Sequence, residues 1–181
     1  MMAGRRTDEV VHHWRDAYNL QYVPNDELEN TVVSNVIASI QINDRELPGV
    51  RKIIALLESH NIPMAVASSS SPEIIDAVLS KLSLKSHMKV AYSAKAEKLG
   101  KPHPGVFLTT AKKLGVRASY CLVFEDALSG IKAAKAAGMK CIAIPEKLNL
   151  SKPEFSEADI ILPSLELVDW NVLCELFGSK A

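Results

Sequence analysis

The chain has 181 residues, of which 48% are hydrophobic, enough for one domain with an apolar core or for a core domain with a small appendage. Lysine plus arginine and aspartate plus glutamate both number 21, so the formal net charge is zero, and no basic stripe indicates a nucleic-acid or membrane partner. The sequence also lacks a long apolar run, a secretory signal and regular cysteine spacing, so we expect a cytoplasmic protein without a disulfide framework or zinc site.

The first elements along the chain are two helices with no strand between them. Apolar residues recur at helical spacing from about Thr7 and again over the next stretch, where Asn25-Asp26 can cap the second helix. The turn Leu47-Pro48-Gly49 separates these helices from the rest of the chain. We therefore predict a partial α-helical cap over residues 1–46 and a core domain over residues 47–181.

The core domain alternates helices with short apolar runs that we interpret as strands. The predicted strands cover 62–67, 89–92, 120–124, 140–144 and 159–162, and the predicted helices cover 50–59, 72–82, 104–114, 127–137 and 165–177. This alternation is typical of βαβ units with a parallel sheet, and strands that are apolar throughout fit a sheet covered by helices on both faces. The predicted fold class is α/β.

Polar groups suited to phosphate chemistry follow three of the apolar runs. The run IPMAVASSSS reaches Ser68 and Ser69, where hydroxyls and N–H groups at a helix start can bind phosphate. Lys101 lies in GKPHP, a loop fixed by two prolines, and suits a phosphoryl group that gathers negative charge. Glu125 and Asp126, in CLVFEDALSG, are adjacent carboxylates that Mg²⁺ can stabilise. Ligands bind at the carboxyl ends of parallel strands, so we expect these residues to meet there.

Each of these signals also has a purely structural interpretation. Serines at a strand-to-helix turn are more often caps, and Ser70 or Ser71 suits that role. A lysine is most often solvated, and Asp126 can cap the helix that follows it. The order of the three segments, with room for about one βα unit in each gap, favours the functional interpretation.

With these segments in this order, the sequence resembles the haloacid dehalogenase superfamily, in the branch of β-phosphoglucomutase and 2-deoxyglucose-6-phosphatase. ASSS is similar to the second motif of that family, GKPHP to the third and FEDALSGI to the fourth, and the resemblance covers nearly the whole chain. It implies a Rossmann-like core. It also implies that Ser68 and Ser69 bind the phosphoryl group, that Lys101 neutralises it, and that Glu125 and Asp126 hold Mg²⁺.

The resemblance also assigns a role to the first predicted helix. GRRTDEVV is similar to a cap segment of the family whose arginine faces the substrate, and Arg6 is the matching residue. The alternative is that Arg6 is only an exposed residue at a helix start.

One part of the family pattern is missing from this chain. Members begin with a strand that ends in D-x-D, in which the first aspartate attacks phosphorus and the second acts as general acid and base. No two aspartates of the chain stand two residues apart, and Asp44-Arg45-Glu46 precedes a turn and a helix rather than following a strand. In the family this strand lies between the strands of the second and fourth motifs, so its loss leaves two facing edges unpaired. We expect a truncated chain that starts partway through the cap.

The resemblance implies a Mg²⁺-dependent phosphomonoester hydrolase that acts on a small sugar or polyol phosphate through an aspartyl-phosphate, and that is inactive as written because its nucleophile is absent. A sugar phosphomutase similar to β-phosphoglucomutase is one alternative. A non-catalytic phosphate-binding product or pseudoenzyme is the other. The expected partner is a small phosphorylated metabolite, with neither nucleic acid nor membrane. A monomer is the working expectation, and the identity of the substrate is left open.

Overall fold

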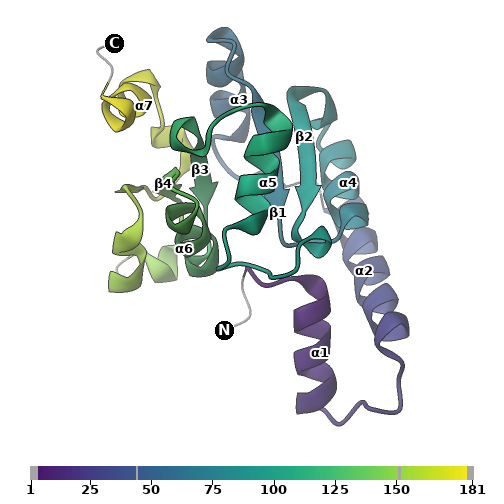
Figure 1. The fold of residues 1–181 in the computed structure, drawn as a ribbon. Helices are drawn as coiled ribbons and strands as arrows, with labels where there is room; N and C mark the ends of the chain where they lie inside the picture. Colours follow the sequence, from purple (N-terminus) through teal and green to yellow (C-terminus); the bar gives the residue numbers. More distant parts are fainter. Residues whose placement is uncertain (1–3, 44, 151, 179–181) are drawn as a thin grey trace.

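The computed structural model describes residues 4–43, 45–150 and 152–178. In chain order, its α-helices and strands are α1 Thr7–Ala17, α2 Asn25–Ile42, α3 Val50–Ser59, β1 Met64–Ser68, α4 Pro72–Lys81, β2 Met88–Ser93, α5 Gly105–Leu114, β3 Leu122–Glu125, α6 Leu128–Ala136, β4 Lys140–Ala143, β5 Ile160–Ile161 and α7 Trp170–Phe177. Strands and helices alternate from α3 onward, as predicted, and the fold is α/β (Figure 1).

The described strands form two parallel sheets rather than one. β1 pairs with β2 in one sheet, and β3, β4 and β5 pair in that order in the other. Ser68 at the end of β1 lies in register with Ser93 at the end of β2, while Glu125 ends β3 opposite Ala143 of β4. The carboxyl ends of β1 and β3 therefore carry two of the predicted polar segments.

Helices cover both faces of the sheets, and the side chains of β4 make this plain. Cys141 and Ala143 belong to the apolar cluster that includes residues of α5 and α6, whereas Ile142 belongs to the cluster of α3 and α7. Neighbouring side chains of a strand point to opposite faces, so the two clusters lie on opposite sides of β4. A third cluster joins α3 and α4 over β1.

The predicted break in the sheet is present between β1 and β3. In the described part of the chain neither strand pairs with the other, and a cavity of about 630 Å³ lies between them. Every residue of β1 and β3 is partly exposed, whereas Cys141, Ile142 and Ala143 of β4 have no exposed surface. The two strands beside the cavity therefore lack the cover that β4 has on both sides.

The two leading helices extend beyond the sheets. α1 projects from the carboxyl edge of the strands, and α2 returns alongside α4, against which it packs (Figure 1). The prediction that Asn25-Asp26 caps α2 is wrong, because the helix already begins at Asn25 and the residue at its N-cap is Pro24, which has no side chain able to cap. The boundary predicted at residues 46 and 47 stays a prediction.

The last helix also starts later than predicted. Leu165–Leu167 forms a separate 3-10 turn, and α7 begins at Trp170 because the Asp169 carboxylate accepts a 3.0 Å hydrogen bond from the Val172 N–H. None of the described helices is long and apolar enough to cross a membrane.

Candidate phosphate-binding site

Lys101 lies across the carboxyl ends of β1 and β3. Its ammonium donates a 3.3 Å hydrogen bond to the Ala67 carbonyl of β1 and pairs with the Glu125 carboxylate of β3. The Phe107 ring lies 4.6 Å from the nitrogen. The side chains of Lys101 and Glu125 are only 6% and 9% exposed, so the alternative of a solvated lysine is wrong.

Glu125 is held in place by its surroundings as well as by the lysine. Its second carboxylate oxygen accepts a 3.4 Å hydrogen bond from the Ala127 N–H at the start of α6. Gly130 of α6 packs directly against this carboxylate, because a Cβ added there would lie well inside 3.0 Å of it. The close approach of α6 to Glu125 therefore requires a residue without a side chain at this position.

Asp126 differs from its neighbour in exposure and in contacts. It is exposed, whereas Glu125 is largely covered. The N-cap of α6 is Ala127, and no side chain caps the helix, so the interpretation of Asp126 as a helix cap is wrong. Asp126 directly follows Glu125 at the end of β3 and has no structural role of this kind.

The four serines after β1 divide into structural and available groups. Ser71 caps α4 by accepting a 3.5 Å hydrogen bond from the Ile74 N–H, so the cap predicted for Ser70 or Ser71 lies at Ser71. Ser68 Oγ accepts a 3.1 Å bond from the Ser70 N–H. Ser68 and Ser69 follow the apolar part of β1, as predicted, and neither caps the helix.

The backbone of Gly4 lies over this edge of the sheets. Ser69 is 8% exposed and donates a 2.8 Å hydrogen bond to the Gly4 carbonyl. A Cβ added at Gly4 would collide with the Ser129 hydroxyl of α6, so the same residue also touches the segment that follows β3. No signal in the sequence indicated this contact, because the resemblance of GRRTDEVV assigned a role only to Arg6.

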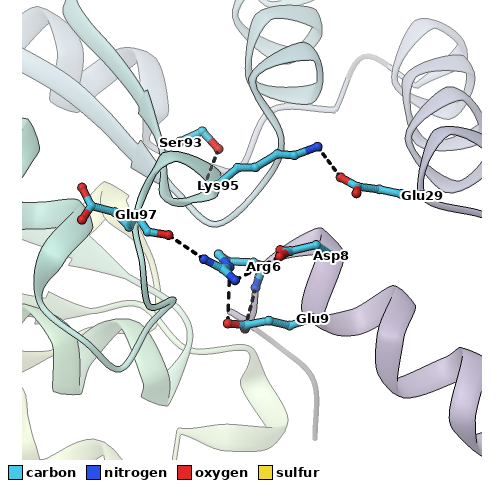
Figure 2. Close-up of polar contacts among 7 residues, drawn as sticks. All are labelled: Arg6, Asp8, Glu9, Glu29, Ser93, Lys95 and Glu97. Atoms are coloured by element: carbon cyan, nitrogen blue, oxygen red, sulfur yellow. Dashed lines mark hydrogen bonds and ion pairs between the residues drawn. The ribbon is translucent and has the colours of Figure 1, made fainter. Parts of the chain in front are cut away.

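Arg6 connects α1 to the loop before GKPHP (Figure 2). Its guanidinium donates a 2.8 Å hydrogen bond to the Glu97 carbonyl and pairs with Asp8 at 3.0 Å and Glu9 at 3.3 Å. The Arg6 side chain is 14% exposed, so the alternative of an exposed helix-start residue is wrong. A Cβ at Gly100 would lie 3.0 Å from the Arg6 side chain, which places Arg6 beside the Lys101 loop. That it faces a substrate stays a prediction.

A second contact near Arg6 was not anticipated from the sequence. Lys95 donates a 2.5 Å bond to the Glu29 carboxylate of α2, and this bond raises the pKa of Lys95 (Figure 2). Ser93, at the end of β2, donates a 2.6 Å bond to the Ser70 carbonyl and accepts one from the Lys95 N–H. The end of β2 thus supports the serine turn after β1. The serine at the end of this strand was the sequence feature that could have indicated the contact.

The predicted metal ligands are limited to two carboxylates. Among residues 4–43, 45–150 and 152–178, no group of three or more histidine, cysteine, aspartate or glutamate side chains could hold a metal ion. Asp44, the start of the rejected D-x-E pattern, lies outside the described residues. The described site therefore gathers Lys101, Glu125 and the serine turn at one edge, with Asp126 next to them.

The chain also matches a known protein family. Residues 4–138 match the family model of the haloacid dehalogenase-like hydrolases. The chain belongs to this family. Hexitol phosphatase B of Escherichia coli (strain K12) is 33% identical over 162 residues, which are 90% of this chain and 73% of that protein. Fructose-1-phosphate phosphatase YqaB of the same organism is 42% identical over 82 residues, 45% of this chain and 44% of its own length.

The fold agrees with that of solved structures related to this family. β-Phosphoglucomutase from Clostridium difficile has a TM-score of 0.85 and 23% identity, over 98% of this chain and 79% of its own. A putative β-phosphoglucomutase from Thermotoga maritima has a TM-score of 0.71 and 28% identity, over 84% of this chain and 71% of its own. The resemblance of the chain to the haloacid dehalogenase family and to its β-phosphoglucomutase-like branch is confirmed. The prediction that the chain belongs to a family of hydrolases is confirmed as well.

Proposed function

We propose that this chain carries the phosphate- and metal-binding part of a Mg²⁺-dependent hydrolase of small sugar or polyol phosphates. The observation that carries the proposal is the buried Lys101 ammonium, held at the junction of the ends of β1 and β3. A phosphoryl group gathers negative charge during transfer, and a fixed cation in a site with little water stabilises that charge strongly. The hydrolase part of the proposal also draws support from the 33% identity with a hexitol phosphatase.

The serine turn supplies hydrogen-bond donors to the same group. Ser68 accepts a bond from the Ser70 N–H, and no acceptor for its own hydroxyl hydrogen is found among the described residues. The Ser68 hydroxyl is therefore the proposed donor to a phosphoryl oxygen, with the Ser69 amide beside it. The Ser69 hydroxyl already bonds to Gly4, so we propose no ligand contact for that hydroxyl.

The chemistry of Glu125 and Asp126 fits Mg²⁺. This ion binds proteins through one or two carboxylates, and it completes its octahedron with water and substrate phosphate oxygens. Two adjacent carboxylates without a third ligating side chain in the described chain suit that mode better than a closed zinc or calcium cage. When bound, the ion would neutralise charge on the phosphoryl oxygens. The protein would contribute Asp126 as the accessible ligand and Glu125 as the one shared with Lys101.

The nucleophile is the missing component in this proposal. The 181 residues contain no D-x-D, and the two adjacent carboxylates at the end of β3 are assigned to the ion. We therefore propose that the chain as written binds phosphate and Mg²⁺ without turning over a phosphate ester. A phosphomutase is the second candidate, favoured by the 28% identity with a putative β-phosphoglucomutase.

Binding and turnover are tested separately on the purified chain. Orthovanadate with Mg²⁺ should raise Tm, and neither additive alone should have the full effect. Lys101→Met and Asp126→Asn should remove the synergy, whereas Lys113→Met, on the far end of α5, should keep it. Release of phosphate from sorbitol 6-phosphate should not exceed the buffer rate. Equal synergy in the Asp126→Asn protein would refute the metal assignment, and turnover that requires Asp126 would refute the proposed inactivity.

The substrate class is tested by the same shift in Tm. Hexitol phosphates should stabilise the chain with Mg²⁺ more than glucose 1-phosphate if the hydrolase assignment is right. Preference for glucose 1-phosphate, or for glucose 1,6-bisphosphate, would favour the phosphomutase instead.

A further inference from the structure

Two residues at the carboxyl end of β2 connect the second helix of the chain with the serine turn, residues 68–71. Ser93 is the last residue of β2, and Lys95 follows in a 3-10 turn over Ala94–Ala96. Figure 2 shows Lys95 between Ser93 and the Glu29 carboxylate of α2. Ser93 is only 6% exposed, so its hydroxyl depends on hydrogen-bond partners within the protein.

A continuous series of hydrogen bonds runs from Lys95 to Ser68. The Lys95 N–H donates a 3.1 Å bond to the Ser93 hydroxyl, which donates a 2.6 Å bond to the Ser70 carbonyl. The Ser70 N–H in turn donates a 3.1 Å bond to the hydroxyl of Ser68, the proposed donor to a phosphoryl oxygen. Bonds in such a series polarise one another, so the position of Lys95 is tied to that of the proposed phosphate ligand.

The side chain of Lys95 is fixed by a helix outside the sheets. Its ammonium donates a 2.5 Å bond to Glu29 of α2, whose side chain is 17% exposed. This bond raises the pKa of Lys95 against the effect of burial, and the charges of Glu73 and Asp8 act in the same direction. Carboxylates that raise the pKa of a lysine attract its charged form, so all three hold the ammonium where it lies.

The charges around Lys95 decide between two roles for this residue. A lysine at this edge of the sheets could bind a phosphoryl group directly, as proposed for Lys101. The Lys95 ammonium, however, already bonds to Glu29, and the nearby carboxylates of Glu73 and Asp8 repel an incoming anion. A role through the hydrogen bonds to the serine turn needs no contact with the anion, and all of its bonds are already made.

We propose that Lys95 is a positioning residue of the phosphate site, because its ion pair with Glu29 holds the end of β2 and this segment holds the serine turn that presents the Ser68 hydroxyl. The inference rests on the proposed function, in which Ser68 binds phosphate, and adds that α2 controls the geometry of this ligand. A partly exposed ion pair contributes modestly, so its loss should weaken anion binding about threefold to fivefold.

The test measures the affinity for orthovanadate with Mg²⁺ by titration calorimetry. Lys95→Met and Glu29→Gln should each weaken binding about threefold to fivefold, whereas Lys95→Arg keeps the pair and should stay within about twofold of the original chain. The double variant Lys95→Met with Glu29→Gln should bind no more weakly than either single variant, because both substitutions remove the same interaction.

Glu29→Gln separates positioning from direct contact by the sign of its effect. If Lys95 bound the anion itself, removal of the carboxylate would free the ammonium and strengthen binding. The matched control is the pair of Lys85 and Asp76, which are 2.6 Å apart, with side chains 52% and 65% exposed, and in which Lys85 precedes β2 rather than following it. Asp76→Asn and Lys85→Met should each leave binding within about twofold of the original chain.

Hydrogen exchange tests the same connection without any anion. The N–H groups of Ser70 and Lys95 both donate to serine hydroxyls in the series. Glu29→Gln should speed the exchange of both amides by about threefold or more. The amide of Cys141, which donates to Asp159 on β4, lies outside the series and should exchange at an unchanged rate.

The two measurements keep this inference separate from the proposed function. Weaker vanadate binding together with faster exchange at Ser70 and Lys95 supports the positioning role of Lys95. Stronger or unchanged binding in Glu29→Gln, or unchanged exchange at Ser70, would overturn that role while the proposed function stands. Absence of vanadate binding in the original chain would refute the proposed function, and the exchange rates would still decide whether α2 holds the serine turn.

Discussion

Gly130→Ala tests whether the packing of α6 positions the central ion pair. The added methyl group would lie well inside 3.0 Å of the Glu125 carboxylate, which is fixed on one side by Lys101 and on the other by the Ala127 N–H. The carboxylate must therefore move, and the pair with Lys101 must break or deform. A more ordinary glycine inside a helix would gain stability from the same substitution, because alanine favours the helix by about 1 kcal/mol.

The magnitude follows from the burial of the pair. Lys101 and Glu125 are 6% and 9% exposed in their side chains, and breaking a buried ion pair costs about 3–5 kcal/mol because it leaves charges without a partner. After subtracting about 1 kcal/mol for the better helix former, we expect the free energy of unfolding to fall by about 2–4 kcal/mol. The sign of the effect is opposite to that expected from helix propensity alone.

The assay is urea unfolding of four proteins. Gly130→Ala is made in the original chain and in a chain that already carries Lys101→Met with Glu125→Ala, where neither the carboxylate nor the buried ammonium remains. In that second chain the substitution should stabilise by about 0.5–1 kcal/mol. A stabilising effect in the original chain, or the same loss in both chains, would refute the claim that Gly130 acts through Glu125.

Two further predictions concern titration and reactivity. Burial raises the pKa of Asp159, but hydrogen bonds from Lys135 at 2.6 Å and from the Cys141 N–H at 2.8 Å outweigh it and lower the pKa below 3.8. The stabilisation by Asp159 is therefore complete above its unfolded pKa and lost as pH falls through the lower folded value, so urea unfolding should show that Asp159→Asn destabilises at pH 7 and much less near pH 3. Burial first, and then the charges of Glu125 and Asp159, raise the pKa of the Cys141 thiol to about 12. At pH 8 iodoacetamide should alkylate the partly exposed Cys121 of the native chain before the buried Cys141. In urea the two thiols should react at similar rates. Equal rates in the native chain would contradict the buried environment of Cys141.

Local patterns predicted most of the secondary structure. The helix predicted at Val50–Ser59 has those bounds. The helix predicted over 104–114 ends at Leu114, where Gly115 follows as the C-cap at a φ of 77°. The first predicted strand begins two residues late, at Met64, after Pro63. These features depend on neighbouring residues, so a single sequence contains the necessary information.

Contacts between distant segments were predicted only where a chemical pattern indicated them. The meeting of Lys101 with Glu125 followed from the expectation that the ends of parallel strands share an edge. The bond from Arg6 to the Glu97 carbonyl joins residues 91 apart and uses a backbone acceptor, which every residue has. No residue type could have indicated Glu97 as the partner, so this part of the site required the structure.

The ion pair has a second consequence, because it also spans the break in the sheet. Lys101 bonds to Ala67 of β1 on one side of the cavity and to Glu125 of β3 on the other, so the group proposed to neutralise phosphate also connects the two sheets. A bound phosphoryl group would compete with Glu125 for this ammonium, and the freed carboxylate would then need another cation. Phosphate and Mg²⁺ should therefore bind cooperatively, because each removes the cost that the other would otherwise incur by separating Lys101 from Glu125.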